Sequence, residues 1–461
     1  MTQIDPRPAL PDTAPDATPS RLLPLTLAQL DFWEEFRHHP DEPVSTVAHV
    51  VTLSGAGDAA VDGEALARAI TQVIAETDVF RLRFTGEGDK SPRQSGDAAP
   101  PPSLRRIDLS DAGDPAAEAR KLIDADMART IDLRRDPLSS QWLIRLGPDL
   151  WQWYNRGHHI ILDGYSMGLI EQRCAELYAH FAQAGPEGRP FSRFTAYLAE
   201  EDAYRASPRH EAAKTFWRGA LARTAPLPLI RKGEENYALA GYGHDFTLPQ
   251  SGAGLAALTK ATGLGWADLM TALASAYLLT HLPRPDTGTG HAGLAVWLPF
   301  MSRMGSVSAR IPALVVNILP LAVHTPSDGL FGTFLTETAA GLRALRRHGR
   351  YRIEQIAEDS GIRFGSRFFF SPLVNVMPFD RPHFDGCAAE RQVLSNGPND
   401  GFNITIRAEH NGSGMQLRID ADPALTPLAE FEAHCRDLPA FLAAALQEKS
   451  LSLPLAALLK S

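Results

Sequence analysis

The stretch HHIILDG, residues 158–164, places three polar side chains in an otherwise apolar connection between a predicted strand and a predicted helix. His158 and His159 are neighbours on extended backbone, so their side chains point to opposite sides and only one can face a substrate cavity. A neutral imidazole can accept a proton from an attacking nucleophile near neutral pH. Asp163 stands where it can cap the helix or pair with a cation, and Gly164 leaves room for a ligand or another backbone segment to approach.

Two other interpretations of this stretch stay open from the residues alone. Both histidines could be hydrogen-bonded core residues, with Asp163 acting only as a helix cap. The stretch could also bind a metal ion, but adjacent histidines face apart and no third ligand follows at helical spacing, so we expect no metal. The three cysteines, Cys174, Cys387 and Cys435, form no CxxC pair and indicate neither a zinc site nor a disulfide framework.

Helical and strand patterns alternate on both sides of this stretch. Residues 141–146 and 150–155 flank a Gly-Pro-Asp turn and predict a β-hairpin that leads to His158. Apolar residues at helical spacing predict helices within residues 60–79 and after Gly164. The other expected elements are strands at 80–84, 293–297 and 314–323, helices at 255–262, 266–282 and 428–446, and a hairpin of residues 402–409 and 415–421. The pattern predicts two α/β lobes that meet near residues 185–195.

Composition limits the classes of protein to consider. The chain has 461 residues, of which 44% are hydrophobic, so it can bury large cores. The composition of residues 1–20 predicts a disordered lead segment, and the turn-forming residues at 87–103 predict a loop. The net charge of -9 argues against a broad basic surface, so we expect no nucleic-acid partner. Because no apolar run reaches roughly 18 residues and no secretory signal is visible, we expect a cytoplasmic protein without a membrane partner.

The stretch matches the HHxxxDG signature of nonribosomal peptide synthetase condensation domains, and further motifs resemble that family along nearly the whole chain. RRHGRYRIEQI, residues 346–356, is similar to the subgroup that includes enterobactin synthase and the vibriobactin amide synthase. GPND, residues 397–400, resembles that subgroup's Gly-Pro-x-Asn-Asp segment but lacks one residue before Asn399. The other family-like motifs are LTLAQLDFW at 25–33, DVFRLRF at 78–84, PFMSR at 299–303 and VVNILPL at 315–321.

The resemblance implies a fold and a set of site residues. The fold is a V-shaped pseudo-dimer of two chloramphenicol-acetyltransferase-like lobes, residues 21–187 and 188–461, with the site in a tunnel between them. The catalytic residue is His159. The other expected site residues are His158, Asp163 and its salt-bridge partner Arg303, which support the site, and Gly164, Asn399 and Asp400, which line the tunnel.

The resemblance also implies a reaction. It is that of a stand-alone condensation enzyme, which moves an acyl group from the 4'-phosphopantetheine arm of an acyl or peptidyl carrier protein to an amine or hydroxyl acceptor. The acceptor is a small molecule or is itself carrier-bound, and the product is an amide or ester in nonribosomal peptide, siderophore or hybrid polyketide biosynthesis. We expect a monomer with no bound cofactor. Two alternatives are a coenzyme A-dependent acyltransferase of the same superfamily and a catalytically inactive carrier-docking platform.

Overall fold

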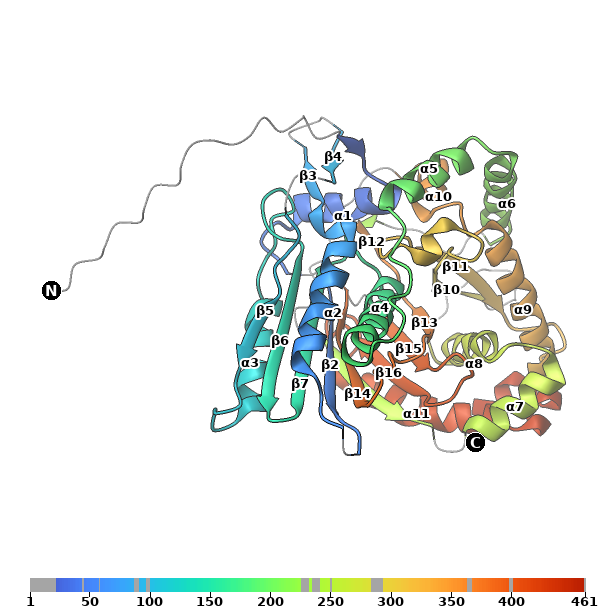
Figure 1. The fold of residues 1–461 in the computed structure, drawn as a ribbon. Helices are drawn as coiled ribbons and strands as arrows, with labels where there is room; N and C mark the ends of the chain where they lie inside the picture. The colour runs from blue at the N-terminus through green and yellow to red at the C-terminus, as the bar shows by residue number, and fades with distance from the viewer. Residues whose placement is uncertain are drawn as a thin grey trace, which may run out of the picture.

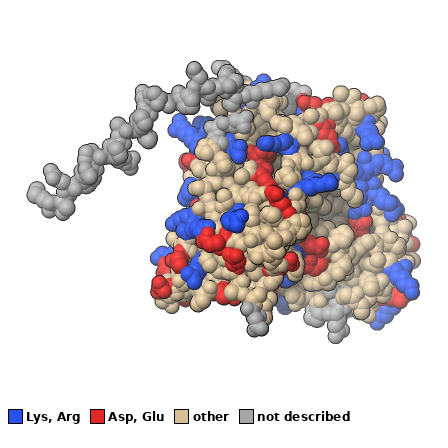
Figure 2. All heavy atoms as spheres, in the orientation of Figure 1, with Lys and Arg blue, Asp and Glu red and all other residues tan. Residues whose placement is uncertain are grey.

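The computed structural model describes the chain except residues 1–21, 44, 58, 87–90, 97–99, 225–231, 234–240, 249–250, 283–292, 363–366, 398–400 and 460–461. The predicted disordered lead and parts of the predicted loop at 87–103 therefore lie outside the described residues. The described residues form two α/β halves that lie side by side, mostly blue to green and mostly yellow to red in Figure 1. Acidic and basic side chains are interspersed on the face of the molecule drawn in Figure 2.

The first half is built on a five-stranded sheet with the strand order β14-β2-β7-β6-β5. The predicted hairpin is confirmed, because β6 and β7 pair antiparallel on either side of the Gly-Pro-Asp turn. Helices α2 and α4 cover one face of this sheet, and α3 packs on the other. The elements are β2 (Thr46–Gly55), β5 (Arg105–Asp108), β6 (Ser139–Gly147), β7 (Leu150–His158), β14 (Cys387–Asn396), α1 (Leu27–His38), α2 (Gly63–Glu76), α3 (Pro115–Met127) and α4 (Gly164–Gln183).

The second half is built on a six-stranded sheet with the strand order β11-β10-β13-β15-β16-β9. Helix α8 is the most buried helix of this half, with Leu269, Leu273 and Tyr277 in the core. The strands are β9 (Tyr242–Thr247), β10 (Gly293–Phe300), β11 (Asn317–His324), β13 (Leu373–Pro378), β15 (Phe402–Ala408) and β16 (Gln416–Ala421). The helices are α5 (Phe194–Arg205), α6 (Pro208–Thr224), α7 (Ser251–Thr262), α8 (Trp266–His281), α9 (Phe331–His348), α10 (Ile353–Asp359) and α11 (Leu428–Ala445).

Shorter elements complete the described fold. A small sheet has the order β1-β4-β3, and β8 pairs with β12. Their bounds are β1 (Leu23–Pro24), β3 (Arg83–Thr85), β4 (Arg93–Ser95), β8 (Lys232–Gly233) and β12 (Arg367–Phe368). Among the helices that the structure describes, none is both long and apolar enough to cross a membrane.

One strand from the predicted second lobe, residues 188–461, belongs to the sheet of the first lobe. Strand β14 belongs to the second half of the sequence, yet it pairs antiparallel with β2 at the edge of the first sheet. Ile311, Ala313, Val315 and Phe384 likewise pack into the core of the first half. The division into residues 21–187 and 188–461 stays a prediction, and it does not account for these crossing segments. They bring the second half of the chain directly to the region around His159.

Two strand predictions were partly wrong. Residues Asp78–Arg81 form a 3₁₀ turn before β3, because this tighter path buries both Val79 and Phe80. Strand β11 begins at Asn317 rather than at residue 314, because the Val315 and Val316 amides donate to the Asp163 carboxylate instead of continuing a ladder. Strand β4 lies inside the predicted loop at 87–103. The predicted helices α7, α8 and α11 and the β15–β16 hairpin are confirmed.

Candidate active site

His158 is the last residue of β7 and His159 follows it, and the two side chains face different surroundings. The His158 amide donates to the Leu138 carbonyl at 2.9 Å, and its Nδ1 accepts the Ile160 amide at 3.1 Å. Burial, together with the neighbouring His159 and Arg156, lowers the pKa of His158 to about 3. His158 is therefore neutral at pH 7, and its backbone hydrogen bonds fix the turn that positions His159.

His159 lines a cavity of about 450 Å³. Its amide donates to the Ser45 carbonyl at 2.7 Å, and its ring stacks on Phe32 with centroids 4.8 Å apart and an interplanar angle of 18°. Its Nδ1 atom is buried without a hydrogen-bond partner among the described residues. Burial lowers the pKa of His159 against the opposing effects of Asp163 and nearby carbonyl groups. The imidazole is therefore neutral at pH 7 and can accept a proton.

Gly397 lies against the edge of the His159 ring. Its backbone has a φ of 97°, a conformation that favours glycine. A Cβ atom added at this position would lie 2.6 Å from His159 Cδ2. Gly397 follows β14, so the crossing strand carries this close contact to the histidine. The His159 ring is therefore stacked on Phe32 and has the Gly397 backbone close to its Cδ2–Nε2 edge.

Asp163 is the N-cap of α4 and is 2% exposed. Its Oδ1 atom accepts the Ser166 amide at 2.9 Å, and its Oδ2 atom accepts the Val315 and Val316 amides at 2.9 and 3.0 Å. Arg303 Nη2 donates to both carboxylate oxygens at 2.9 and 2.8 Å. Although burial acts to raise the pKa of Asp163, Arg303 and these hydrogen bonds hold it below its usual value. Asp163 is therefore ionised at pH 7.

Arg303 is also buried, at 3% exposure, and its guanidinium reaches several backbone carbonyls of its own loop. Nη1 donates to the Ile311 carbonyl at 2.8 Å, and Nη2 donates to the Ala313 carbonyl at 2.7 Å. The guanidinium carbon lies 4.7 Å from the centre of the Tyr165 ring. The pair of Asp163 and Arg303 therefore fastens the loop before β11 to the first turn of α4. Asp163 is not available to accept a proton from a substrate, because both of its carboxylate oxygens already accept hydrogen bonds from protein groups.

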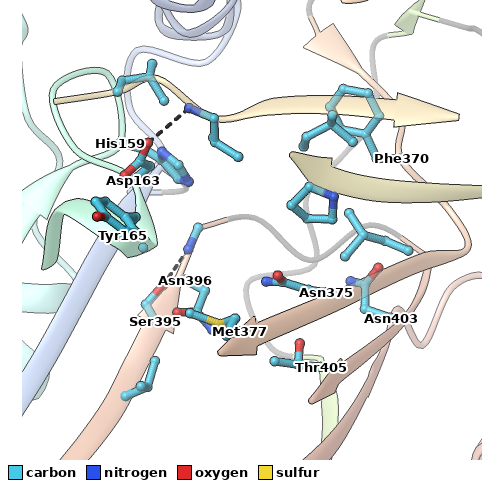
Figure 3. Close-up of a pocket in the computed structure, with 18 of the residues that line it drawn as sticks. His159, Asp163, Tyr165, Phe370, Asn375, Met377, Ser395, Asn396, Asn403 and Thr405 are labelled. Carbon is cyan, nitrogen blue, oxygen red and sulfur yellow. Dashed lines mark hydrogen bonds between the residues drawn. The ribbon is translucent and has the colours of Figure 1, made fainter. Parts of the chain in front are cut away.

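Both halves of the chain form the walls of the cavity. In Figure 3, His159, Asp163 and Tyr165 lie on one side, and Asn375, Asn403 and Thr405 lie opposite them. The predicted residue Gly164 also lines the cavity, and Met377 approaches it closely enough that an added Cβ atom would lie 3.3 Å from Met377 Cε. The predicted residues Asn399 and Asp400 lie outside the described residues. Among the described residues, no group of three His, Cys, Asp or Glu side chains could hold a metal ion.

Several cavity residues were not predicted from the sequence. Phe32 and Gly397 touch His159 from distant segments, and no local signal connects them to it. Strand β15 did carry a usable signal, because its polar and apolar residues alternate. Asn403, Thr405 and Arg407 line the cavity, whereas Ile404 and Ile406 are buried in the core of the second half. A strand with one polar face inside a protein indicates a ligand-facing wall.

The chain is similar to known condensation proteins. The sequence profile of the condensation domain matches residues 20–459. A dimodular nonribosomal peptide synthase of Bacillus subtilis is 31% identical over 89% of this chain, and enterobactin synthase component F of Escherichia coli is 31% identical over 85%. The chain spans 17% and 30% of the lengths of these two relatives.

A solved structure is also similar. The crystal structure of VibH, a nonribosomal peptide synthetase condensation enzyme, is 33% identical and has a TM-score of 0.81. The alignment covers 94% of this chain and all of that one. This match confirms the predicted fold class, a mixed α/β protein with chloramphenicol-acetyltransferase-like lobes.

Proposed function

Because the chain belongs to the condensation-domain family of acyltransferases, we propose that it transfers an acyl group from a carrier-protein phosphopantetheine thioester to an amine or hydroxyl acceptor. Condensation domains of this family act on substrates bound to carrier proteins. The observation that carries the proposal is the neutral imidazole of His159, which faces a cavity walled by both halves of the chain. Such a cavity can hold two reactants end to end.

The proposed reaction forms one bond and breaks one. The acceptor nitrogen or oxygen attacks the thioester carbonyl carbon, and the resulting tetrahedral centre expels the phosphopantetheine thiolate. The acceptor loses a proton, and the leaving sulfur gains one, so charge is conserved. His159 orients the acceptor by a hydrogen bond and takes its proton as the new bond forms. The thioester is already activated, so no covalent enzyme intermediate and no resident cofactor are required.

The other site residues have supporting roles in this proposal. His158 fixes the turn before His159, and the ion pair of Asp163 and Arg303 fixes the turn after it. Gly164 keeps the cavity open at the start of α4. Both walls of the cavity come from one chain, so we propose that a monomer is active. The carriers dock through weak, transient contacts beside the mouths of the cavity.

Intact-mass analysis of acylated carrier proteins tests the proposal. A carrier loaded through its phosphopantetheine arm is incubated with an amine or a hydroxyl acceptor, with and without the protein. The same acyl group on coenzyme A is the matched control for the donor. We expect deacylation of the carrier together with formation of the matching amide or ester. Transfer only from coenzyme A would favour a coenzyme A-dependent acyltransferase, and carrier binding without any product would favour a docking platform.

A further inference from the structure

Strand β15 places the cationic side chain of Arg407 in the wall of the cavity. Arg407 lies two residues after Thr405 on the cavity-facing side of the strand, and it is half-buried. It stands opposite Met377 of β13 in the parallel register, and Met377 in turn approaches Gly164. The end of β15 that carries Arg407 therefore lies toward the first turn of α4, close to the segment that carries His159.

The guanidinium of Arg407 has no ion pair with any residue that the structure describes. Within the described part of the chain, none of its nitrogens makes a side-chain hydrogen bond or a salt bridge, and its Nε atom is buried and unsatisfied. The acidic groups that act electrostatically on Arg407 are Asp245 and Asp420, and both are already paired with Arg418. A third nearby arginine, Arg391, is paired with Glu171 at 3.3 Å. Of Arg391, Arg407 and Arg418, Arg407 is therefore the one without a carboxylate partner among the described residues.

An unpaired cation at this position is costly unless a ligand compensates it. Burial lowers the pKa of Arg407, but a guanidinium keeps its charge at neutral pH. A partly buried charge without a hydrogen-bonded partner loses hydration, and the attraction of Asp245 and Asp420 offsets that loss only in part. A carboxylate offers two oxygens that match the donor fork of a guanidinium. Asn375 and Thr405 on the same wall supply further polar groups for such a ligand.

We propose that Arg407 binds a carboxylate on one of the two substrates, at a position distant from the reacting carbonyl or amine. The inference rests on the proposed acyl transfer and adds a substrate class to it. The carboxylate belongs either to the acyl donor or to the acceptor. Both sources use the same recognition chemistry, and the experiment separates them.

The test compares substrates that differ only in the charged end. The donor pair is the glutaryl and pentanoyl thioesters of N-acetylcysteamine, and the acceptor pair is 4-aminobutyrate and butylamine. Affinity for each probe is measured by calorimetric titration, and kcat/KM is measured where transfer occurs. A charged hydrogen bond of this kind gives a preference of about tenfold to a hundredfold for the carboxylate member of one pair. That preference should fall to less than about threefold in Arg407→Gln.

Arg343→Gln is the matched control, because Arg343 is exposed on α9 and outside the cavity. It should keep the wild-type preference, and Arg407→Lys should keep only part of it. Equal affinity of the wild-type protein for both members of both pairs would overturn the inference, as would a preference that survives in Arg407→Gln. If the carboxylate preference appears in binding but no carrier thioester is ever consumed, the proposed function fails and the Arg407 site stands.

Discussion

Replacing Asp163 with asparagine tests the ion pair that fastens the two halves. Asparagine has a similar shape, but it removes the charge that compensates Arg303, and both partners are 3% exposed or less. Its amide group would also direct hydrogen atoms toward the Val315 and Val316 amides if it replaced Oδ2. Breaking a buried pair in this way typically costs about 3–5 kcal/mol. We expect Asp163→Asn to lower the free energy of unfolding by that amount in urea titrations at pH 7.

The matched control is Asp124→Asn, which breaks the exposed pair with Arg120. Both side chains of that pair are more than half exposed, so the expected loss is below about 1 kcal/mol. The pH dependence supplies a second check. The pKa of Asp163 is lowered in the folded protein, so its contribution is present above about pH 4 and is lost as the pH falls through the folded pKa. A loss below about 1 kcal/mol for Asp163→Asn at pH 7 would refute this account of the pair.

Three further predictions concern the surroundings of His159. Gly397→Ala should reduce kcat/KM by about tenfold or more with an unchanged circular-dichroism spectrum, since the added Cβ meets the His159 ring; Gly57→Ala also replaces a glycine of positive φ, at 65° rather than 97°, but it has no neighbour within 4 Å and should not affect activity. Burial lowers the pKa of His159, so the acid limb of the kcat/KM profile should have its midpoint below pH 6.5, and a midpoint above that value would be contrary to the account. Phe32→Leu removes the stacked ring and should lower kcat more than it raises KM, as steady-state kinetics would show.

Local patterns were sufficient to predict the elements that deliver the histidine. The turn Gly147-Pro148-Asp149 and its flanking apolar runs predict the β6–β7 hairpin, because hairpin pairing depends on neighbours in sequence. The helical spacing after Gly164 predicts α4 for the same reason. The pairing of Asp163 with Arg303 lies across 140 residues, and only the family resemblance indicated it before the structure was known.

The crossing strand could not be predicted from any local pattern. Strand β14 pairs with β2 across more than 300 residues, and its exposed and half-buried residues carry no mark of its partner. The contact of Gly397 with His159 depends on that pairing, and Phe32 reaches His159 from the distant helix α1. Cavity residues on β15 were different, because the alternation of Asn403, Thr405 and Arg407 with isoleucines is visible in the sequence. What was lacking was knowledge that the polar face of β15 lies inside the protein.

The most direct test of the account is a single-turnover measurement of acyl transfer with wild-type protein and His159→Ala. An acyl-loaded carrier and a saturating acceptor are mixed with excess protein, quenched in time, and quantified by intact mass. We predict that the rate falls by about a hundredfold or more in His159→Ala, while the folded state and carrier binding match the wild type. A His159→Ala rate within about threefold of the wild-type rate would contradict the central claim, because the transfer would then not depend on the histidine in this cavity.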